Sequence, residues 1–172
     1  MKPIMSLLIT LSLTWGVFGS ASRPQPNAHA SGFSRVKNFD GLSVDSLADL
    51  AKARRATAKY HRVEQAEADG YINLNFCEEG EGCHWLKPSL LDGEFDPSEP
   101  EILLYTPDKD GWRLVAVEYV VPLAMSAVAP AGFVGDADHW REDSEGVGLW
   151  ELTVWLWLDN PNGLYEQHNP RA

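Results

Sequence analysis

Hydrophobic residues recur at helical spacing between positions 43 and 69. The recurring positions are Leu47, Leu50, Ala53, Ala56, Tyr60 and Val63. Steps of three and four residues place these side chains on one face of a helix. Ser43 or Asp45 can cap its beginning, and Gly70, after Asp69, can take the left-handed conformation that ends a helix. The pattern predicts one helix of about 25 residues, long enough to lie across a sheet.

The segments that follow this helix have the composition of β-strands. They are residues 71–76, 101–106, 112–121 and 150–158. The first alternates polar and apolar side chains, whereas 112–121 and 150–158 are apolar on both faces and are predicted to be central strands covered on both sides. The turn-forming residues 107–111 predict a hairpin. Residues 86–100 and 122–148 are predicted to be loops.

A helix followed by at least four strands, with no second convincing helix, is typical of α+β proteins. We therefore predict one long N-terminal helix packed on a curved antiparallel sheet of four to five strands, in a single domain over residues 42–172. Residues 22–41 contain Pro24, Pro26 and Gly32 without hydrophobic periodicity. This segment is predicted to be a flexible leader.

Residues 1–21 have the features of a secretory signal peptide. Lys2 precedes an apolar run over residues 4–17, and residues 19–21 are the small residues that a signal peptidase recognises. The apolar run is shorter than the about 20 residues that a membrane span needs. We expect cleavage after Ala21 and a mature protein that is secreted or periplasmic and not attached to a membrane.

The charge balance of the chain is acidic, with 25 acidic residues, 14 basic residues and a formal net charge of −11. Nucleic acids and anionic membranes attract basic surfaces, so this balance argues against both as partners. The sequence also lacks the Gly-x-Ser-x-Gly, P-loop, dinucleotide-binding and His-Glu-x-x-His motifs. The hydrolase, nucleotide-dependent and zinc-protease chemistries that use these motifs are therefore disfavoured.

Two cysteines, Cys77 and Cys83, enclose a short loop that contains two glycines. An exported chain meets an oxidising compartment, so a disulfide between them is expected. Such a bridge would stabilise the fold by about 2 kcal/mol by restricting the unfolded chain. The alternative is a metal site that uses both cysteines and His84, although zinc sites usually space their cysteines more closely.

Glu118 is the most informative polar residue, because it interrupts the apolar run of residues 114–121. Burying an ionised carboxylate without a partner is prohibitive, so Glu118 must be paired, metal-bound or protonated. The cations considered as partners are Arg54, Arg55, His61, Arg62 and His84. One interpretation is an ion pair that only locks helix to sheet. The other is a pocket formed by Glu118, His61 and His84.

Three kinds of function remain open for this cluster. The leading hypothesis is an exported binding domain, whose pocket between helix and sheet holds a divalent metal ion or a small ligand through His61, His84 and Glu118. The alternative is a cofactor-independent lyase or isomerase of the cyclase or hydratase type. There Glu118 or His61 would act as base, His84 as acid, and residues 122–148 as a lid. The third is an interaction protein without chemistry, which exposed tryptophans would favour.

Tryptophans are concentrated in the last predicted strand. Trp155 and Trp157 are predicted to share one face of it, with Trp150 on the other. Two rings in line on an exposed face can form a sugar-binding platform. Aromatic side chains in a central strand usually belong to the core, and we predict that role here.

Several short sequence motifs lie along the chain between residues 56 and 170. They are Ala-Thr-Ala-Lys-Tyr-His at 56–61, Ala-Asp-Gly-Tyr at 68–71, Cys-His-Trp at 83–85, Leu-Leu-Asp-Gly at 90–93, Leu-Val-Ala-Val-Glu-Tyr at 114–119, and Trp-Leu-Trp at 155–157 before two Asn-Pro pairs. Over residues 53–171 they resemble a family of small exported bacterial proteins without an established function. That family carries a histidine where this chain has Thr153, and a cysteine after the last Asn-Pro. The resemblance thus implies a weaker case for a metal site and a stronger one for pairing Cys77 with Cys83.

Overall fold

The computed structural model describes residues 39, 41–109, 111–143 and 146–172. The predicted signal peptide, residues 1–21, and nearly all of the predicted leader therefore lie outside the described residues. Within the described part of the chain, none of the helices combines the length and the apolar character that crossing a membrane requires.

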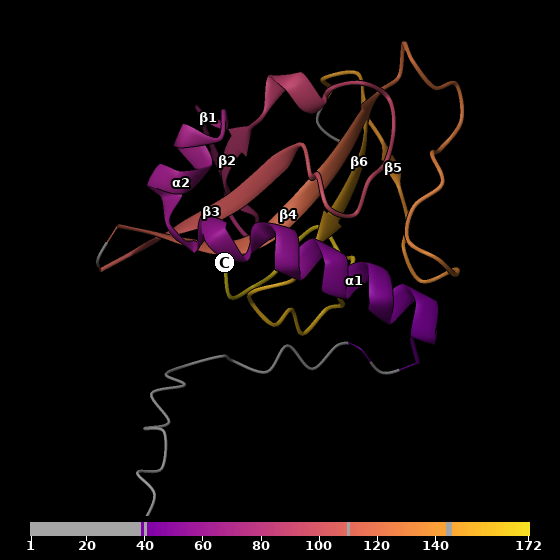
Figure 1. Cartoon of the computed structure of the whole chain (residues 1–172), viewed down its shortest axis with the longest axis horizontal. Helices are drawn as coiled ribbons and strands as arrows, with labels where there is room; N and C mark the ends of the chain where they lie inside the picture. Colours follow the sequence, from indigo (N-terminus) through magenta and orange to yellow (C-terminus); the bar gives the residue numbers. More distant parts are fainter. Residues whose placement is uncertain (1–38, 40, 110, 144–145) are drawn as a thin grey trace, which may run out of the picture. The chain divides into compact units, whose positions relative to one another are not determined.

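The described residues form a six-stranded antiparallel sheet that a helical segment crosses (Figure 1). The spatial order of the strands is β1-β2-β3-β4-β6-β5. The strands are β1 (Ile72–Glu78), β2 (Gly82–Leu86), β3 (Ile102–Asp108), β4 (Gly111–Pro122), β5 (Arg141–Glu142) and β6 (Leu149–Val154). The helical elements are α1 (Val44–Thr57), the 3₁₀ helix η1 (Ala58–His61), α2 (Val63–Ala68) and the 3₁₀ helix η2 (Pro88–Leu90).

The helical segment is interrupted, so the prediction of one long helix of about 25 residues is wrong. The 14 residues of α1 continue into the 4 residues of η1, which ends at His61. Arg62 then takes an extended conformation, with φ −100° and ψ 108°, and α2 begins at Val63.

The interruption at Arg62 has a cause in the core. Tyr105 of β3 is buried, and its hydroxyl donates a 2.7 Å hydrogen bond to the carbonyl oxygen of Tyr60. Because a side chain satisfies this carbonyl, the chain can leave the helix there without an unpaired acceptor. The predicted end of the segment is confirmed: Gly70 has φ 98°, and its amide donates to the carbonyl of Glu67.

The prediction of a sheet with four to five strands is wrong as well, because the described residues form six strands. Two strands were missed, β2 in a segment without a predicted strand and β5 within the predicted loop 122–148. The 5 residues of β2 are nearly all buried and so do not alternate, and β5 has only 2 residues. The predicted hairpin is confirmed, with Asp108 of β3 opposite Gly111 of β4. The mixture of α and β structure is also present.

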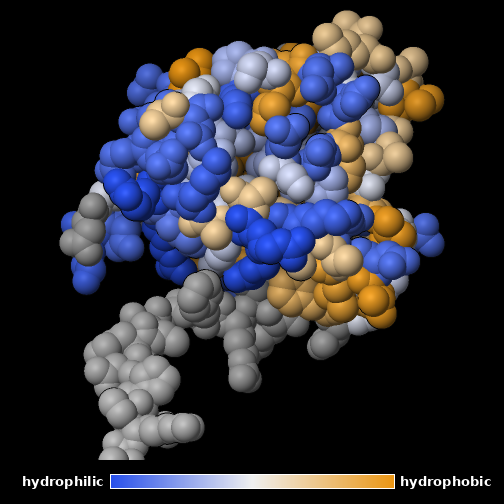
Figure 2. All heavy atoms as spheres, viewed as in Figure 1, coloured by the Kyte–Doolittle hydropathy of each residue, from blue (hydrophilic) through white to orange (hydrophobic). Residues whose placement is uncertain are grey.

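The sheet separates two apolar layers. The cluster that packs against the helices includes Leu50, Ala53, Leu103, Tyr105, Val117 and Leu152. The other cluster includes Ile102, Leu104, Ala116, Val120 and Trp155. Successive side chains of a strand point to opposite faces, so neighbours such as Leu103 and Leu104 belong to different layers. We call the side of the sheet away from α1 and α2 the far face. Hydrophilic side chains cover much of the helical side (Figure 2).

Trp155 and Trp157 are buried in the core, as predicted, but they do not share a strand face. The strand β6 ends at Val154, so both residues follow it. Trp155 packs in the far-face cluster, and Trp157 packs in the cluster beneath the helices. None of the tryptophans in the described part of the chain is exposed, so they form no open platform for a sugar or a partner.

Candidate functional site

Glu118 lies in the long central strand β4, on the far face of the sheet. It pairs with Ile102 of β3 on one side and with Thr153 of β6 on the other. Its residue is only 5% exposed, whereas its neighbours Val117 and Tyr119 belong to the cluster beneath the helices. The prediction that Glu118 is buried is therefore confirmed.

Two residues surround one oxygen of the Glu118 carboxylate. The Thr153 hydroxyl donates a 3.0 Å hydrogen bond to Oε1, and Nη2 of Arg141 lies 3.8 Å from the same oxygen. Arg141 also donates a 2.8 Å hydrogen bond to the hydroxyl oxygen of Thr153. Oε1 of Glu118 therefore faces one hydrogen-bond donor and one positively charged group.

His84 of β2 faces the other oxygen of the same carboxylate. Its Nε2 lies 3.7 Å from Oε2 of Glu118 and 4.0 Å from Oε2 of Glu81. Its Nδ1 lies 3.3 Å from the carbonyl oxygen of Phe76, which can only accept, so the proton is assigned to Nδ1. Burial lowers the pKa of His84, so the ring is neutral at neutral pH and Nε2 carries a lone pair.

The Nε2 atom of His84 is buried and has no hydrogen-bond partner among the described residues. A buried acceptor in this state costs about 1–3 kcal/mol. The ring of Phe76, on the edge strand β1, packs against the imidazole with 5.0 Å between ring centroids. A hydrogen-bond donor would therefore satisfy Nε2 of His84. The ring of Phe76 lies beside this imidazole.

His61 is not part of this cluster. It ends η1 in the helical layer, and its ring packs edge-on against Trp157 with 4.3 Å between centroids. Arg54 of α1 lies over the same indole, 4.4 Å from its centroid. The structure thus brings His84 and Glu118 together and leaves His61 on the other side of the sheet. The predicted location of the site, between helix and sheet, is wrong, because the two residues that converge lie on the far face.

Glu81 joins the cluster from the turn between β1 and β2. The residue is 1% exposed. Burial, reinforced by the nearby charge of Glu118, raises the pKa of Glu81 to about 8. Its Oε1 has no hydrogen-bond partner among the described residues, although Nε2 of the exposed His168 lies 3.4 Å away. Glu81 is therefore mostly protonated at neutral pH, which leaves the cluster with one negative charge fewer.

A pocket of about 260 Å³ lies on the far face beside this cluster. Its polar residues are His84 of β2, Glu118 of β4 and Glu151 of β6. Its apolar residues are Leu74, Phe76, Leu86, Leu91, Ile102, Val120, Val147 and Leu149. The pocket therefore combines a largely apolar lining with a few acceptor groups supplied by three strands.

The metal hypotheses gain no support from this geometry. Cys77 and Cys83 form a disulfide, which confirms the predicted bridge and removes both sulfurs as thiolate ligands. In the part of the chain that the structure describes, no group of three or more His, Cys, Asp or Glu side chains is arranged to hold a metal ion. His84 and Glu118 would need a third ligand, and His61 lies in the other layer.

No protein-family model, curated protein or solved structure matches this chain. The resemblance to small exported bacterial proteins therefore stays a prediction, and so does export itself.

Sequence reasoning missed three residues near Glu118, namely Glu81, Arg141 and Glu151. Glu151 carried a usable signal, because it is also a carboxylate within an apolar strand segment. Arg141 and Glu81 carried none, because one belongs to a long predicted loop and the other to a turn with several acidic residues. Strand pairing decides their place: Arg141 of β5 lies opposite Glu151 of β6.

Proposed function

We propose that the far-face pocket binds a small organic molecule with an apolar body and a head group that donates hydrogen bonds or carries positive charge. The observation that carries the proposal is the buried Nε2 of His84, an acceptor with no partner among the described residues, next to the carboxylate of Glu118. Buried polar atoms are almost always hydrogen-bonded, so an exception beside a pocket indicates a place that a ligand completes.

The lining of the pocket favours an apolar body. Residues such as Leu74, Ile102 and Leu149 line it, and a molecule that covers them gains about 25 cal/mol for each Å² of apolar surface removed from water. A volume of about 260 Å³ lies at the small end of ligand pockets, so the ligand should be small as well.

The polar residues favour a donor or cationic head group. The neutral Nε2 of His84 and the carboxyl groups of Glu118 and Glu151 all accept hydrogen bonds. The Arg141 guanidinium lies at Oε1 of Glu118, whereas Oε2 faces Nε2 of His84, so an ammonium or hydroxyl group placed between these two atoms would meet two acceptors. The net charge of −11 attracts cations to the protein and so also favours a cationic head group.

A titration of three ligands with the same alkyl chain tests this proposal. Hexylamine, hexanol and hexanoate share an apolar body and differ in the head group. We expect the amine to bind most tightly, the alcohol less tightly and the carboxylate not measurably. Chemical-shift changes at amides of β2, β4 and β6 would locate the site. Equal binding of all three ligands, or stronger binding of the carboxylate, would contradict the proposal.

Two pairs of variants separate the head-group contacts from general effects of substitution. Glu118→Gln should weaken amine binding by roughly tenfold, because it removes the charge that the ammonium group meets. Its control is Glu64→Gln, an equal change of charge on the exposed surface of α2. His84→Gln should weaken both amine and alcohol, and His61→Gln, in the other layer, should weaken neither.

One observation favours a second candidate, a cofactor-independent lyase or isomerase. His84 Nε2 and Glu118 Oε2 lie 3.7 Å apart beside an apolar pocket, so a base and a second titratable group stand together. Proton abstraction next to a carbonyl group is the reaction class that such a pair supports. His61 no longer belongs to this mechanism, because it lies across the sheet.

Deuterium exchange tests the catalytic alternative. Proton NMR in D₂O would follow the loss of the α-proton signals of small cyclic ketones. Catalysis predicts exchange that depends on the protein and is lost in Glu118→Gln, while that variant keeps its fold by circular dichroism. Exchange at the buffer rate across the ketones would reject this candidate and leave the binding proposal intact.

A further inference from the structure

The Cys77–Cys83 disulfide ties the end of the edge strand β1 to β2. Cys77 lies opposite Cys83, and one further register pair follows before the turn. Between Asn73 and Cys77 the register shifts, and Asn75 adopts a positive φ of 53°. The end of β1 beyond this irregularity is thus held by two register pairs and the disulfide.

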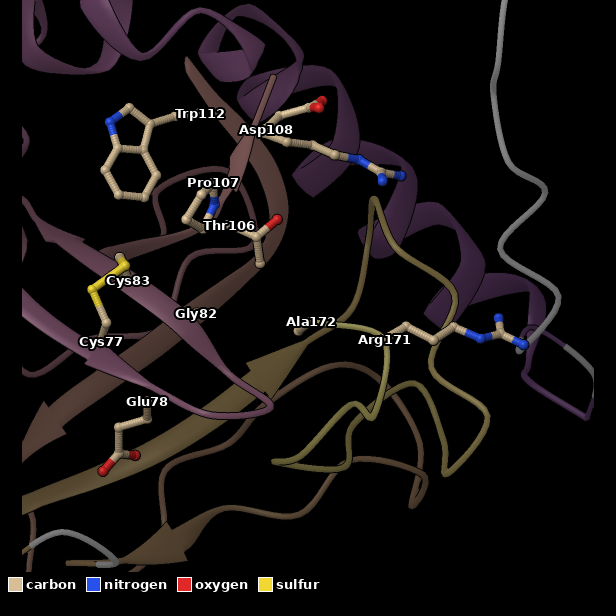
Figure 3. Close-up of a pocket in the computed structure, with 11 residues that line it drawn as sticks. Cys77, Glu78, Gly82, Cys83, Thr106, Pro107, Asp108, Trp112, Arg171 and Ala172 are labelled. Carbon is tan, nitrogen blue, oxygen red and sulfur yellow. A yellow bond between two sulfur atoms is a disulfide. The ribbon is translucent and has the colours of Figure 1, made fainter. Parts of the chain in front are cut away.

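The two cysteine residues of the bridge differ in exposure. Cys77 is exposed on β1, whereas Cys83 is only 4% exposed. Both cysteines line a cavity of about 570 Å³, which Trp112 and Pro107 of the β3–β4 hairpin also border (Figure 3). A small molecule therefore has both the room and the path to reach Cys77 first.

Charged groups of both signs line this cavity. Arg113 and Arg171 line it together with Glu78 and Asp108, and Arg171 is paired with Asp159 at 2.6 Å. Arg113 therefore provides a positive charge near an incoming thiolate, although the protein as a whole carries −11. The surroundings of Cys77 thus tolerate the anionic nucleophile that disulfide exchange requires.

The bridge also lies next to the contact that shields His84. Phe76 precedes Cys77, and His84 follows Cys83. The Phe76 carbonyl accepts the Nδ1 proton of His84, and its ring packs on the imidazole. His84 is 2% exposed as a result of this packing and of the sheet beneath it. Loosening the end of β1 would therefore uncover His84 and, beside it, Glu118.

We infer that the Cys77–Cys83 disulfide is a thiol–disulfide exchange site for a low-molecular-weight thiol, and that exchange there opens the far-face pocket. The thiolate sulfur attacks Sγ of Cys77 and forms a new S–S bond. The old S–S bond breaks, and its electron pair leaves on Sγ of Cys83, which takes a proton from water. A second molecule of the small thiol can then attack the mixed disulfide. Cys77 is released as a thiol, and the two small-thiol molecules leave joined by a disulfide bond. The part of this inference that concerns the pocket rests on the proposed function.

Opening follows from the weak attachment of β1. Exposed disulfides are the more readily exchanged ones, and an edge strand held by few pairs opens locally at low free energy once the bridge is gone. The apparent affinity of a ligand falls in proportion to the fraction of protein in which its site is closed. Exchange at Cys77 should therefore raise the affinity for the amine ligand.

The first experiment treats the native protein with glutathione and locates the products by peptide mass. We expect a mixed disulfide on Cys77 without added denaturant. Amide hydrogen exchange in residues 76–78 should become roughly tenfold faster or more, while β3 and β4 keep their protection. Reoxidation should restore the slow exchange. A mixed disulfide on Cys83, no reaction in the native state, or loss of protection throughout the sheet would each overturn the inference.

Chemical modification of histidines tests the uncovering of His84 without any ligand. Diethyl pyrocarbonate should modify His84 only after reduction. The exposed His61, in the helical layer, and the exposed His139, shortly before the opposite edge strand β5, should react equally in both states and serve as internal controls. Modification of His84 to the same extent before and after reduction would overturn the opening.

Amine binding in the two redox states then separates this inference from the proposed function. Tighter binding of hexylamine after reduction supports both. If no amine binds in either state while His84 becomes reactive, the proposed ligand class is wrong and the exchange site stands. If the amine binds equally in both states and His84 stays unreactive, the proposed function stands and the redox opening is rejected.

Discussion

Glu81 shows how strongly burial can shift the pKa of a single side chain. It is flanked by two glycines in a turn, where carboxylates are usually solvated, yet the residue is almost completely buried. The loss of hydration, with Glu118 nearby, raises its pKa to about 8. The proton that it retains allows two carboxyl groups and His84 to share a small volume.

This pKa predicts that Glu81 makes stability fall as the pH rises. Between its ordinary value of 4.5 and about 8, the folded protein holds a proton on Glu81 that the unfolded chain has released. The free energy of unfolding should therefore decrease through this window, with a slope of up to about 1.4 kcal/mol per pH unit for one proton. Glu81→Gln removes this dependence, so its stability relative to wild type should increase with pH.

Urea unfolding at a series of pH values measures the difference between the two proteins. The buried Glu101, whose pKa burial also raises to about 8, contributes equally to both and cancels. Glu79→Gln, an exposed neighbour in the same turn, is the control and should parallel wild type. Parallel curves for Glu81→Gln and wild type would show that Glu81 is ionised in the folded protein.

At the scale of elements, a buried tyrosine decides where a helix stops. The hydroxyl of Tyr105 reaches from β3 to the Tyr60 carbonyl, and Arg62 leaves the helix two residues later. The hydrogen bond joins the helical layer to the sheet at the point where η1 ends. It therefore fixes the direction in which α2 begins.

Removing this hydroxyl should destabilise the protein. Tyr105→Phe leaves the Tyr60 carbonyl without its side-chain donor, and we expect a loss of about 1–3 kcal/mol in the free energy of unfolding. Tyr165→Phe is a matched control, because the Tyr165 hydroxyl is buried without a hydrogen-bond partner among the described residues. That variant should stay within about 0.5 kcal/mol of wild type or gain stability. Equal losses measured by urea unfolding would contradict the assigned role of Tyr105.

At the scale of the whole described structure, the position of a strand in the sheet predicts how strongly its amides are protected from hydrogen exchange. The 12-residue strand β4 is paired with β3 on one side and with β6 on the other. The strands β1 and β5 lie at the two edges, and β1 is largely exposed. The far-face cluster around Glu118 therefore rests on the best-paired strand, whereas Phe76 comes from a weakly attached one.

Native-state hydrogen exchange should reproduce this gradient. Amides in the centre of β4 are expected to exchange only through global unfolding. Amides of β1 and β5 should exchange by local opening, about a hundredfold faster or more. Uniform rates across all six strands would indicate that the sheet opens as one unit, and would also remove the basis for a separate motion of β1.

Local features of this protein could be predicted from its amino-acid sequence. The end of the helical segment at Gly70, the hairpin at residues 107–111 and the disulfide between Cys77 and Cys83 were all predicted correctly. So was the burial of Glu118. Each depends on neighbouring residues or on a simple rule of solvation, and such information lies within a short stretch of chain.

Features that depend on pairing between distant segments became known from the three-dimensional fold. A hydroxyl from β3 interrupted the predicted single helix, and strand pairing revealed β2 and β5, neither of which shows an alternating pattern of its own. The same pairing placed His84 and Arg141 beside Glu118 and left His61 across the sheet. The periodicity of a strand indicates that its side chains alternate between two faces. Which face meets the helices depends on register, because a shift of one residue exchanges the two sets.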